Sequence, residues 1–178
     1  ITLTYINGHT YVFGCGDFRN DNPETVTYIK CKDEYSLCSK FMELWVRMYP
    51  DVITGWNTKF FDIPYLVNRF NRILGEDETK KLSPWNNVWE RTFVHKGQQK
   101  KVYNMTGIAA LDYIELYRWY APAGKSQESY SLNHISSVEL NETKLSYEEF
   151  VKFYNRRGWA KKGSPEYAIQ LPEDKVTL

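Results

Sequence analysis

Residues 51–70, with the sequence DVITGWNTKFFDIPYLVNRF, place the strongest constraint on how this chain can fold. A short apolar run, Val52-Ile53, leads through a Gly-Trp-Asn turn into an amphipathic segment. Apolar side chains recur in that segment at the i, i+3, i+4 and i+7 spacing of one helix face, namely Ile63, Leu66, Val67 and Phe70. The pattern predicts a buried strand followed by a helix that begins at Asp62 and ends at Gly75.

The carboxylate of Asp62 has two interpretations. It lies at the head of a helix, just beyond the carboxyl end of a strand, where open α/β sheets place ligand sites. An acid in a first helical turn is also favoured by the helix dipole and needs no further role. The alternative is a metal-binding or catalytic carboxylate. The helical pattern alone leaves both interpretations open.

The first third of the chain predicts strands followed by a helix. An antiparallel hairpin is expected around Asn7-Gly8, and a third strand over residues 26–31. Asp33 can cap a helix that Pro50 brings to an end. The apolar face of that helix contains Leu37, Phe41, Leu44, Trp45 and Met48. Together with residues 51–70, these segments predict a mixed sheet with helices packed on it.

The later segments predict a charged loop over residues 76–81 and a β-hairpin over residues 88–105. Three lysines near the hairpin tip, at positions 96, 100 and 101, form either a solvated face or a set of phosphate contacts. Residues 108–111 are predicted to be a buried strand, and Asp112 is expected to cap the helix that follows. Further candidates are helices over residues 130–140 and 145–154 and a strand over residues 167–171.

Composition limits the function classes without selecting one. The net charge of +1 creates no global basic field, so composition alone does not indicate a nucleic-acid binder. Three cysteines, Cys15, Cys31 and Cys38, form no C-x-x-C pair and are interpreted as buried free thiols of a reducing compartment. The chain shows no apolar run long enough to span a membrane, no signal peptide and no G-x-S-x-G, H-E-x-x-H or P-loop motif.

Asn57, Phe61 and Asp62 form the pattern N-x-x-x-F-D directly after a T-G-W strand end. This pattern resembles the second exonuclease motif of family B DNA polymerases, in the form found in T-even-type bacteriophage replicases. Further blocks resemble those proteins in order and spacing, at residues 72–76, 81–84, 111–117 and 129–132. The resemblance therefore covers roughly residues 1–155.

The resemblance implies an α/β fold, with an RNase H-like mixed sheet flanked by helices and an inserted β-hairpin. It also implies 3′–5′ proofreading, in which two divalent ions, Mg²⁺ or Mn²⁺, hydrolyse the terminal phosphodiester of single-stranded DNA. Asp62 would be the catalytic metal ligand, Asn57 would hydrogen-bond the terminal nucleotides, and Phe61 would pack at the floor of the site or against a base. The expected partners are a single-stranded primer terminus and the polymerase domains of the parent chain, in the host cytoplasm.

The family pattern contains four carboxylates, and only Asp62 matches one of them. No D-x-E occurs in the 178 residues, and neither Tyr154 nor Tyr167 is followed by the expected Asp. We therefore expect a piece of a longer protein that is inactive alone. The D-x-E strand of the family lies between the hairpin and the strand that ends at Trp56, so its absence would leave two unpaired edges. We expect the place of the missing strand to be filled by a rearrangement of the sheet, by residues 167–171 or by strand exchange in a dimer.

Two functional hypotheses remain. In the first, residues 1–157 form an incomplete exonuclease-like domain and residues 158–178 a divergent C-terminal segment. In the second, the chain is a catalytically dead RNase H-like module that binds single-stranded DNA or a replication protein, with Asp62 acting only as a helix cap. The missing carboxylates favour the second hypothesis, whereas the intact N-x-x-x-F-D motif favours the first.

Overall fold

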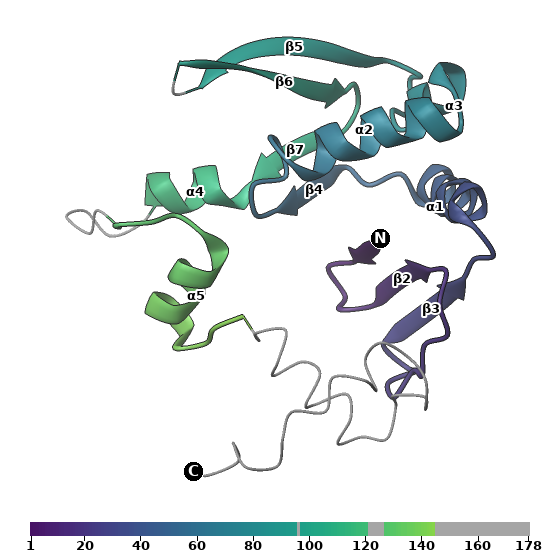
Figure 1. The fold of residues 1–178 in the computed structure, drawn as a ribbon, viewed down its shortest axis with the longest axis horizontal. Helices are drawn as coiled ribbons and strands as arrows, with labels where there is room; N and C mark the ends of the chain where they lie inside the picture. Colours follow the sequence, from purple (N-terminus) through teal and green to yellow (C-terminus); the bar gives the residue numbers. More distant parts are fainter. Residues whose placement is uncertain (96, 121–126, 145–178) are drawn as a thin grey trace, which may run out of the picture. The chain divides into compact units, whose positions relative to one another are not determined.

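The computed structural model describes residues 1–95, 97–120 and 127–144 (Figure 1). The chain divides into two compact units, Ile1–Ser126 and Gln127–Leu178. The predicted helix over residues 145–154 and the predicted strand over residues 167–171 lie outside the described residues. The elements of the first unit are β1 (Thr2–Thr4), β2 (Thr10–Gly14), β3 (Val26–Lys30), α1 (Glu34–Met48), β4 (Val52–Gly55), α2 (Asp62–Ile73), α3 (Glu76–Lys80), β5 (Val88–His95), β6 (Gln98–Met105), β7 (Ala109–Asp112) and α4 (Tyr113–Tyr120).

Strands β1, β2 and β3 form one small sheet in that order. β1 and β2 are antiparallel, with Leu3 opposite Tyr11, and β3 runs parallel to β2. The predicted hairpin is confirmed, because Gly8 adopts φ +85° and its N–H donates to the Tyr5 carbonyl at 2.9 Å. Only glycine takes up that left-handed conformation without a steric cost, so the Asn-Gly pair fixes the turn.

Strands β4 and β7 form a second, parallel sheet in which Val52 lies opposite Ala109. Both strands were predicted to be buried, and this prediction is wrong. Val52 is 52% exposed and Leu111 is 44% exposed, while Asp112 is the buried residue of β7. A two-stranded sheet is buried only where other elements cover it, and within the described residues both strands keep a largely open face.

The core is built by the apolar faces of α1 and α2. Phe41 is fully buried and its ring lies 5.4 Å from that of Phe70 and 5.6 Å from that of Phe13, so both helices and the first sheet meet there. The helix predicted from residue 62 is confirmed, since Val67 and Phe70 are buried and the helix ends before Gly75. Burying aromatic rings of this size contributes about 2–3 kcal/mol each.

Helix α1 also matches the prediction in its cap and its boundaries. The Asp33 carboxylate accepts the Ser36 N–H at 2.7 Å, which satisfies one of the free donors of the first turn. Arg69 of α2 forms two hydrogen bonds to the Glu34 carboxylate, which joins the two helices at their surface. Met48 departs from the prediction, because it lies in the last turn and is 39% exposed.

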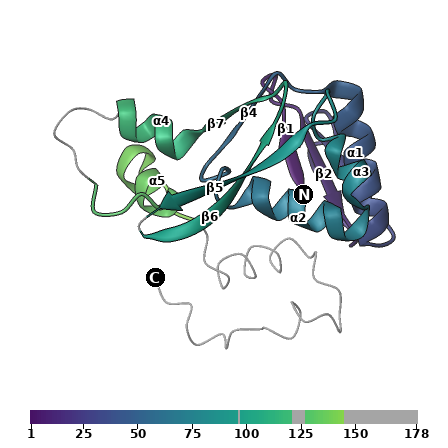
Figure 2. The same cartoon turned by 90° about the horizontal axis from the view of Figure 1, so that it is seen from above.

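Residues 76–81, predicted to be a loop, contain the short helix α3. Its acidic first turn suits the helix dipole, and Lys80 and Lys81 pair with Asp77 and Glu78 three residues earlier. The predicted hairpin is confirmed as β5 and β6, which run antiparallel alongside α2 (Figure 2). Tyr103 of β6 donates its hydroxyl to Asn68 of α2 at 2.9 Å.

The cysteines are free, as predicted, but only Cys31 and Cys38 are buried; Cys15 is exposed. It lies in the polar loop between β2 and β3. Burial raises the pKa of the Cys38 thiol, so this side chain stays protonated and packs as a small apolar group. In the second unit, helix α5 (Leu132–Leu140) is capped by Ser131, whose hydroxyl accepts the His134 N–H.

The first unit contains three sheets, namely β1–β2–β3, β4–β7 and the hairpin β5–β6, and among the described residues no strand pairing joins them. Ile1 forms backbone hydrogen bonds with Phe13 of β2, and the Tyr5 N–H donates to the carbonyl of His9, just before β2. The backbone groups of Thr2 and Thr4 therefore face the opposite side of β1. In the part of the chain that the structure describes, no strand pairs with that side of β1 or with the free side of β4. Among the same residues, no helix is long and apolar enough to cross a membrane.

Candidate functional site

The candidate site lies where β4 and β7 end side by side. The two strands are parallel, and Gly55 at the end of β4 lies opposite Asp112 at the end of β7. The residues that follow each strand therefore emerge at the same edge, where parallel sheets bring loops and helix N-termini together. After β4 comes the turn over residues 56–61, and after β7 comes the first turn of α4.

Asp112 connects these two segments. Its side chain is buried, and Oδ1 accepts the backbone N–H of Asn57 at 2.8 Å while Oδ2 accepts that of Lys59 at 3.0 Å. Oδ1 also accepts the N–H of Ile114 at 3.1 Å. The predicted cap on the following helix is confirmed. The two bonds to the turn were not predicted, because nothing local in the sequence relates positions 55 residues apart.

The turn itself has little conformational freedom. Asn57 adopts φ +63°, a left-handed conformation that asparagine tolerates better than most residues. A Cβ atom on Gly55 would lie 2.5 Å from Cγ2 of Thr58, so this position requires glycine unless Thr58 moves. The Asn57 carbonyl then accepts the Phe61 N–H at 3.1 Å, and the Thr58 carbonyl accepts the Ile63 N–H at 2.9 Å. These two backbone hydrogen bonds link the turn to the start of α2.

Asp62 is the first residue of α2, and its side chain is exposed. The N-cap residue is Phe61, and the helix start has no side-chain cap. Among the described residues, no hydrogen bond or ion pair to the Asp62 carboxylate is found. The cap interpretation is therefore not supported by a bond, and the carboxylate faces solvent at the positive end of the helix dipole.

Asn57 and Phe61 lie in the short turn that immediately precedes Asp62. Phe61 is 66% exposed, which is unusual for a phenylalanine and leaves its ring accessible. The Asn57 side chain is half-buried. The structure thus places all three sequence-predicted residues at one edge of the sheet, although no hydrogen bond among the described residues joins their side chains.

Amino groups and aromatic rings surround this turn. Lys59 pairs with Glu115 of α4, with Nζ and Oε1 2.7 Å apart. The Lys59 and Lys100 amino groups lie 5.6 and 5.4 Å from the centre of the Phe60 ring, so Lys100 brings the hairpin to the turn. Trp56 packs against Tyr117 of α4 at 5.9 Å. Cations and flat rings are the groups that hold phosphates and stack on bases.

The described residues do not provide a ligand set for divalent metal ions. Among them no three His, Cys, Asp or Glu side chains lie together. Asp112 is occupied by backbone N–H groups, and Glu115 is paired with Lys59. Mg²⁺ and Mn²⁺ prefer several carboxylate oxygens, so the single exposed carboxylate of Asp62 does not fit a two-metal centre.

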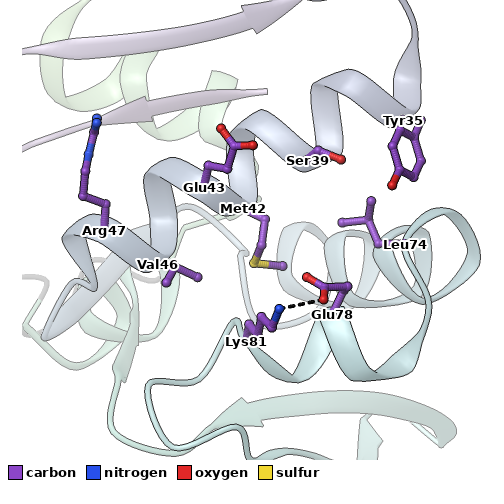
Figure 3. Close-up of a pocket in the computed structure, with 9 residues that line it drawn as sticks. All are labelled: Tyr35, Ser39, Met42, Glu43, Val46, Arg47, Leu74, Glu78 and Lys81. Carbon is purple, nitrogen blue, oxygen red and sulfur yellow. Dashed lines mark hydrogen bonds and ion pairs between the residues drawn. The ribbon is translucent and has the colours of Figure 1, made fainter.

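A surface cavity of about 520 Å³ lies away from these residues, between α1 and the segment that carries α3 (Figure 3). Met42 and Val46 of α1 line one wall of the cavity, and Leu74 and the Lys81–Glu78 pair, with Nζ and Oε1 2.6 Å apart, line the other. None of Asn57, Phe61 and Asp62 lines it. The cavity and the candidate site are therefore separate features.

The fold and the motif define a class of protein. The sequence model of the DNA polymerase family B exonuclease domain matches residues 3–135, and the chain belongs to this family. The DNA-directed DNA polymerase of Escherichia phage RB69 is 35% identical over 125 residues, which are 70% of this chain. That of Enterobacteria phage T4 is 32% identical over the same length. The chain is therefore similar to the polymerases of T-even-type phages.

The similarity extends to more distant polymerases. The DNA polymerase delta catalytic subunit of Candida albicans is 29% identical over 119 residues, which are 62% of this chain and 11% of that subunit. Against the two phage polymerases, the chain spans 14% of the length of each relative. The family assignment thus concerns an exonuclease domain, which is a small part of the matching enzymes.

Proposed function

We propose that this chain is the part of a 3′–5′ proofreading exonuclease domain that holds the single-stranded end of a DNA primer. The observation that carries the proposal is the exposed pair Phe61-Asp62 at the head of α2, where the turn that bears Asn57 ends. Asn57 would hydrogen-bond the terminal nucleotides, Phe61 would stack on a base, and Asp62 would supply one catalytic carboxylate.

The surroundings of the turn suit single-stranded DNA. An exposed ring such as Phe61 contributes about 1–3 kcal/mol for each stacked base, and it does so without regard to sequence. Lys59 and Lys100 place positive charge beside the ring of the preceding residue, Phe60, whereas the chain as a whole carries only +1. Binding should therefore be local to the turn and should weaken as salt rises. A proofreading module needs stacking that does not depend on base sequence, because it must accept any mismatched base.

Hydrolysis would need more carboxylates than the described residues supply. Family B exonuclease domains depend on divalent metal ions, and we expect Mg²⁺ or Mn²⁺ to bind only where further acidic ligands join Asp62. The chain alone is accordingly proposed to bind DNA and to hydrolyse it poorly or not at all. In the complete protein, the polymerase domains of the parent chain would deliver the primer end, in the cytoplasm of the host cell.

The finer fold that we propose is RNase H-like, with β5 and β6 as an inserted hairpin and residues 1–157 as the domain. The unjoined sheets support this arrangement, since one more strand between β1 and β4 would unite β1–β2–β3 and β4–β7 into a single mixed sheet. That strand would carry the D-x-E acids. A second copy of the chain could also satisfy the free edges by strand exchange, and sedimentation analysis would reveal the resulting dimer.

One observation favours a second candidate function. Because no acidic cluster exists among the described residues, a catalytically dead RNase H-like module that binds single-stranded DNA or a replication protein fits the same site. The two functions share the DNA-binding turn and differ in the role of Asp62. In the dead module Asp62 would only complement the helix dipole.

Because the chain alone is expected to hydrolyse DNA poorly or not at all, a nuclease assay with Mn²⁺ and a 3′-labelled single strand separates the two functions when it is run on the complete parent protein. Metal-dependent trimming that Asp62→Ala abolishes would establish chemistry, and tight binding without trimming would establish the binding module. Asp77→Ala is the matched control, because Asp77 also lies in the first turn of a helix and is exposed. A wild-type chain that neither binds nor trims single strands would overturn both functions.

A further inference from the structure

Asp112 accepts more hydrogen bonds than the capping of α4 requires. A cap needs only one or two bonds to the first turn of its own helix, and here the bond to Ile114 supplies this. The remaining two bonds go to Asn57 and Lys59, in the turn that follows β4. Asp112 is only 4% exposed, so these three bonds take the place of water around a buried charge.

The bonds from Asp112 reach the exposed residues through the backbone. Asn57 is held by its N–H and, through its carbonyl, holds the N–H of Phe61. Lys59 is held by its N–H, and its amino group pairs with Glu115 one turn into α4. Figure 1 shows α4 continuing directly from β7 beside β4, so this support comes from regular elements rather than from another loop. The turn is thus fixed from the α4 side at two successive points.

We propose that Asp112 is a positioning residue of the candidate site, which holds the Asn57–Lys59 backbone and thereby sets where Phe61 and Asp62 are presented. The inference rests on the proposed function, since it assigns Asp112 a part in DNA binding without any contact to DNA. It also explains why a full carboxylate is present: Oδ1 accepts two N–H groups, and Oδ2 accepts the third.

Asp112→Asn tests the assignment because it removes one acceptor only. With its carbonyl oxygen in place of Oδ1, the amide still caps α4 and still binds Asn57. Its NH₂ group would face the Lys59 N–H, donor against donor, and this bond is lost. Amide exchange measured by NMR should show faster exchange at Lys59 and unchanged protection at Ile114. Affinity for a short 5′-fluorescein oligothymidylate should fall on the order of 10-fold or more, as for other supporting residues of a site.

Two controls separate positioning from general stability. Asp33→Asn makes the same exchange at the cap of α1, where an amide serves equally well, and should leave affinity unchanged. Val67→Ala lowers the melting temperature through the core and should likewise leave affinity within about twofold. A loss of affinity in Asp112→Asn at a melting temperature equal to that of Val67→Ala would support positioning.

Different results would overturn the role of Asp112 and the proposed binding of DNA. Equal affinity of wild type and Asp112→Asn, with Lys59 exchange accelerated, would overturn the inference and leave the proposed function standing. A wild-type chain that does not bind the oligothymidylate would overturn the proposed function and the inference with it. Should Asp112→Asn fail to fold, rapid amide exchange at Asn57 and Lys59 in the folded wild type would still refute the inference, and strong protection there would support it.

Discussion

The backbone N–H of Asn57 donates to the carboxylate of Asp112 at 2.8 Å, across 55 positions of the sequence. This bond joins the turn that follows β4 to the carboxyl end of β7. The turn with the N-x-x-x-F-D motif rests on that strand end, and the exposed residues of the motif extend from it. The order of the candidate site therefore derives from a residue outside the motif.

Asp112→Ala should lower the free energy of unfolding by about 3 kcal/mol, because three backbone N–H groups lose their acceptor in a buried place. Urea unfolding followed by circular dichroism measures the change. Asp33→Ala removes a single exposed cap bond and should lower it by only about 1 kcal/mol. Equal losses in the two variants would show that the bonds to Asn57 and Lys59 add no stability.

Phe41 and Phe61 should behave in opposite ways. Phe41→Ala leaves a cavity at the centre of the core and should reduce stability by about 3–5 kcal/mol. Phe61→Ala removes an exposed ring and should change stability by less than about 0.5 kcal/mol, but weaken binding of a single strand by about 1–3 kcal/mol. Urea unfolding and fluorescence anisotropy give the two quantities. Unchanged DNA affinity in Phe61→Ala would contradict its stacking role.

Gly55→Ala should destabilise the turn, since the added Cβ would lie 2.5 Å from Cγ2 of Thr58. Thr58→Ser removes that methyl group, so the double variant should recover most of the lost stability and DNA affinity. A double-mutant cycle by urea unfolding checks this expectation, with a coupling energy of about 1 kcal/mol or more between the two positions. Additive effects would mean that the Gly55 backbone is constrained for another reason.

The ion pair between Glu34 and Arg69 should make stability dependent on pH. The hydrogen bond that Arg69 donates to the Glu34 carboxylate holds the pKa of that carboxyl below its ordinary value. Because the pKa of Glu34 is lower in the folded chain, the ion pair stabilises the fold fully at any pH above the ordinary glutamate pKa of about 4.3. This stabilisation is lost as the pH falls through the lowered pKa of the folded chain. The stability difference between wild type and Glu34→Gln should thus be constant from pH 7 to about pH 5 and vanish in more acidic solution.

Urea unfolding across that pH range measures the difference, and Glu43→Gln on the same helix controls for removal of one charge. Because both side chains of the pair are partly exposed, added salt should also reduce the difference. A difference that persists into strong acid would show that Glu34 acts through packing and not through its charge.

Local periodicity predicted much of the fold. The helices from Asp33 and from Asp62 and the hairpin over residues 88–105 follow from side-chain spacing and caps, which are properties of contiguous residues. The local sequence pattern did not predict that β4 and β7 are exposed, because the burial of a strand depends on which other elements cover it. Helix α3 escaped prediction because its five residues are all polar and show no apolar face.

The sequence predicted the motif residues of the candidate site but not the residues that support them. The motif gave Asn57, Phe61 and Asp62 through resemblance, and the structure places them in the turn before α2 and at the first residue of that helix. The support from Asp112 and the Lys59–Glu115 pair depends on parallel pairing of distant strands, which no local pattern encodes. One signal was available, since an acid that follows each of two strands suggests a shared edge.

The position of bound DNA on the protein shows whether the turn before α2 is the binding site. Titration of the ¹⁵N-labelled chain with a short single-stranded oligonucleotide, followed by amide NMR spectra, reports every residue near the ligand. We predict concerted shifts over residues 57–62 and at Lys100, with little change around the cavity that Met42 and Val46 line. Shifts confined to that cavity, or none at all, would show that residues 57–62 do not bind DNA.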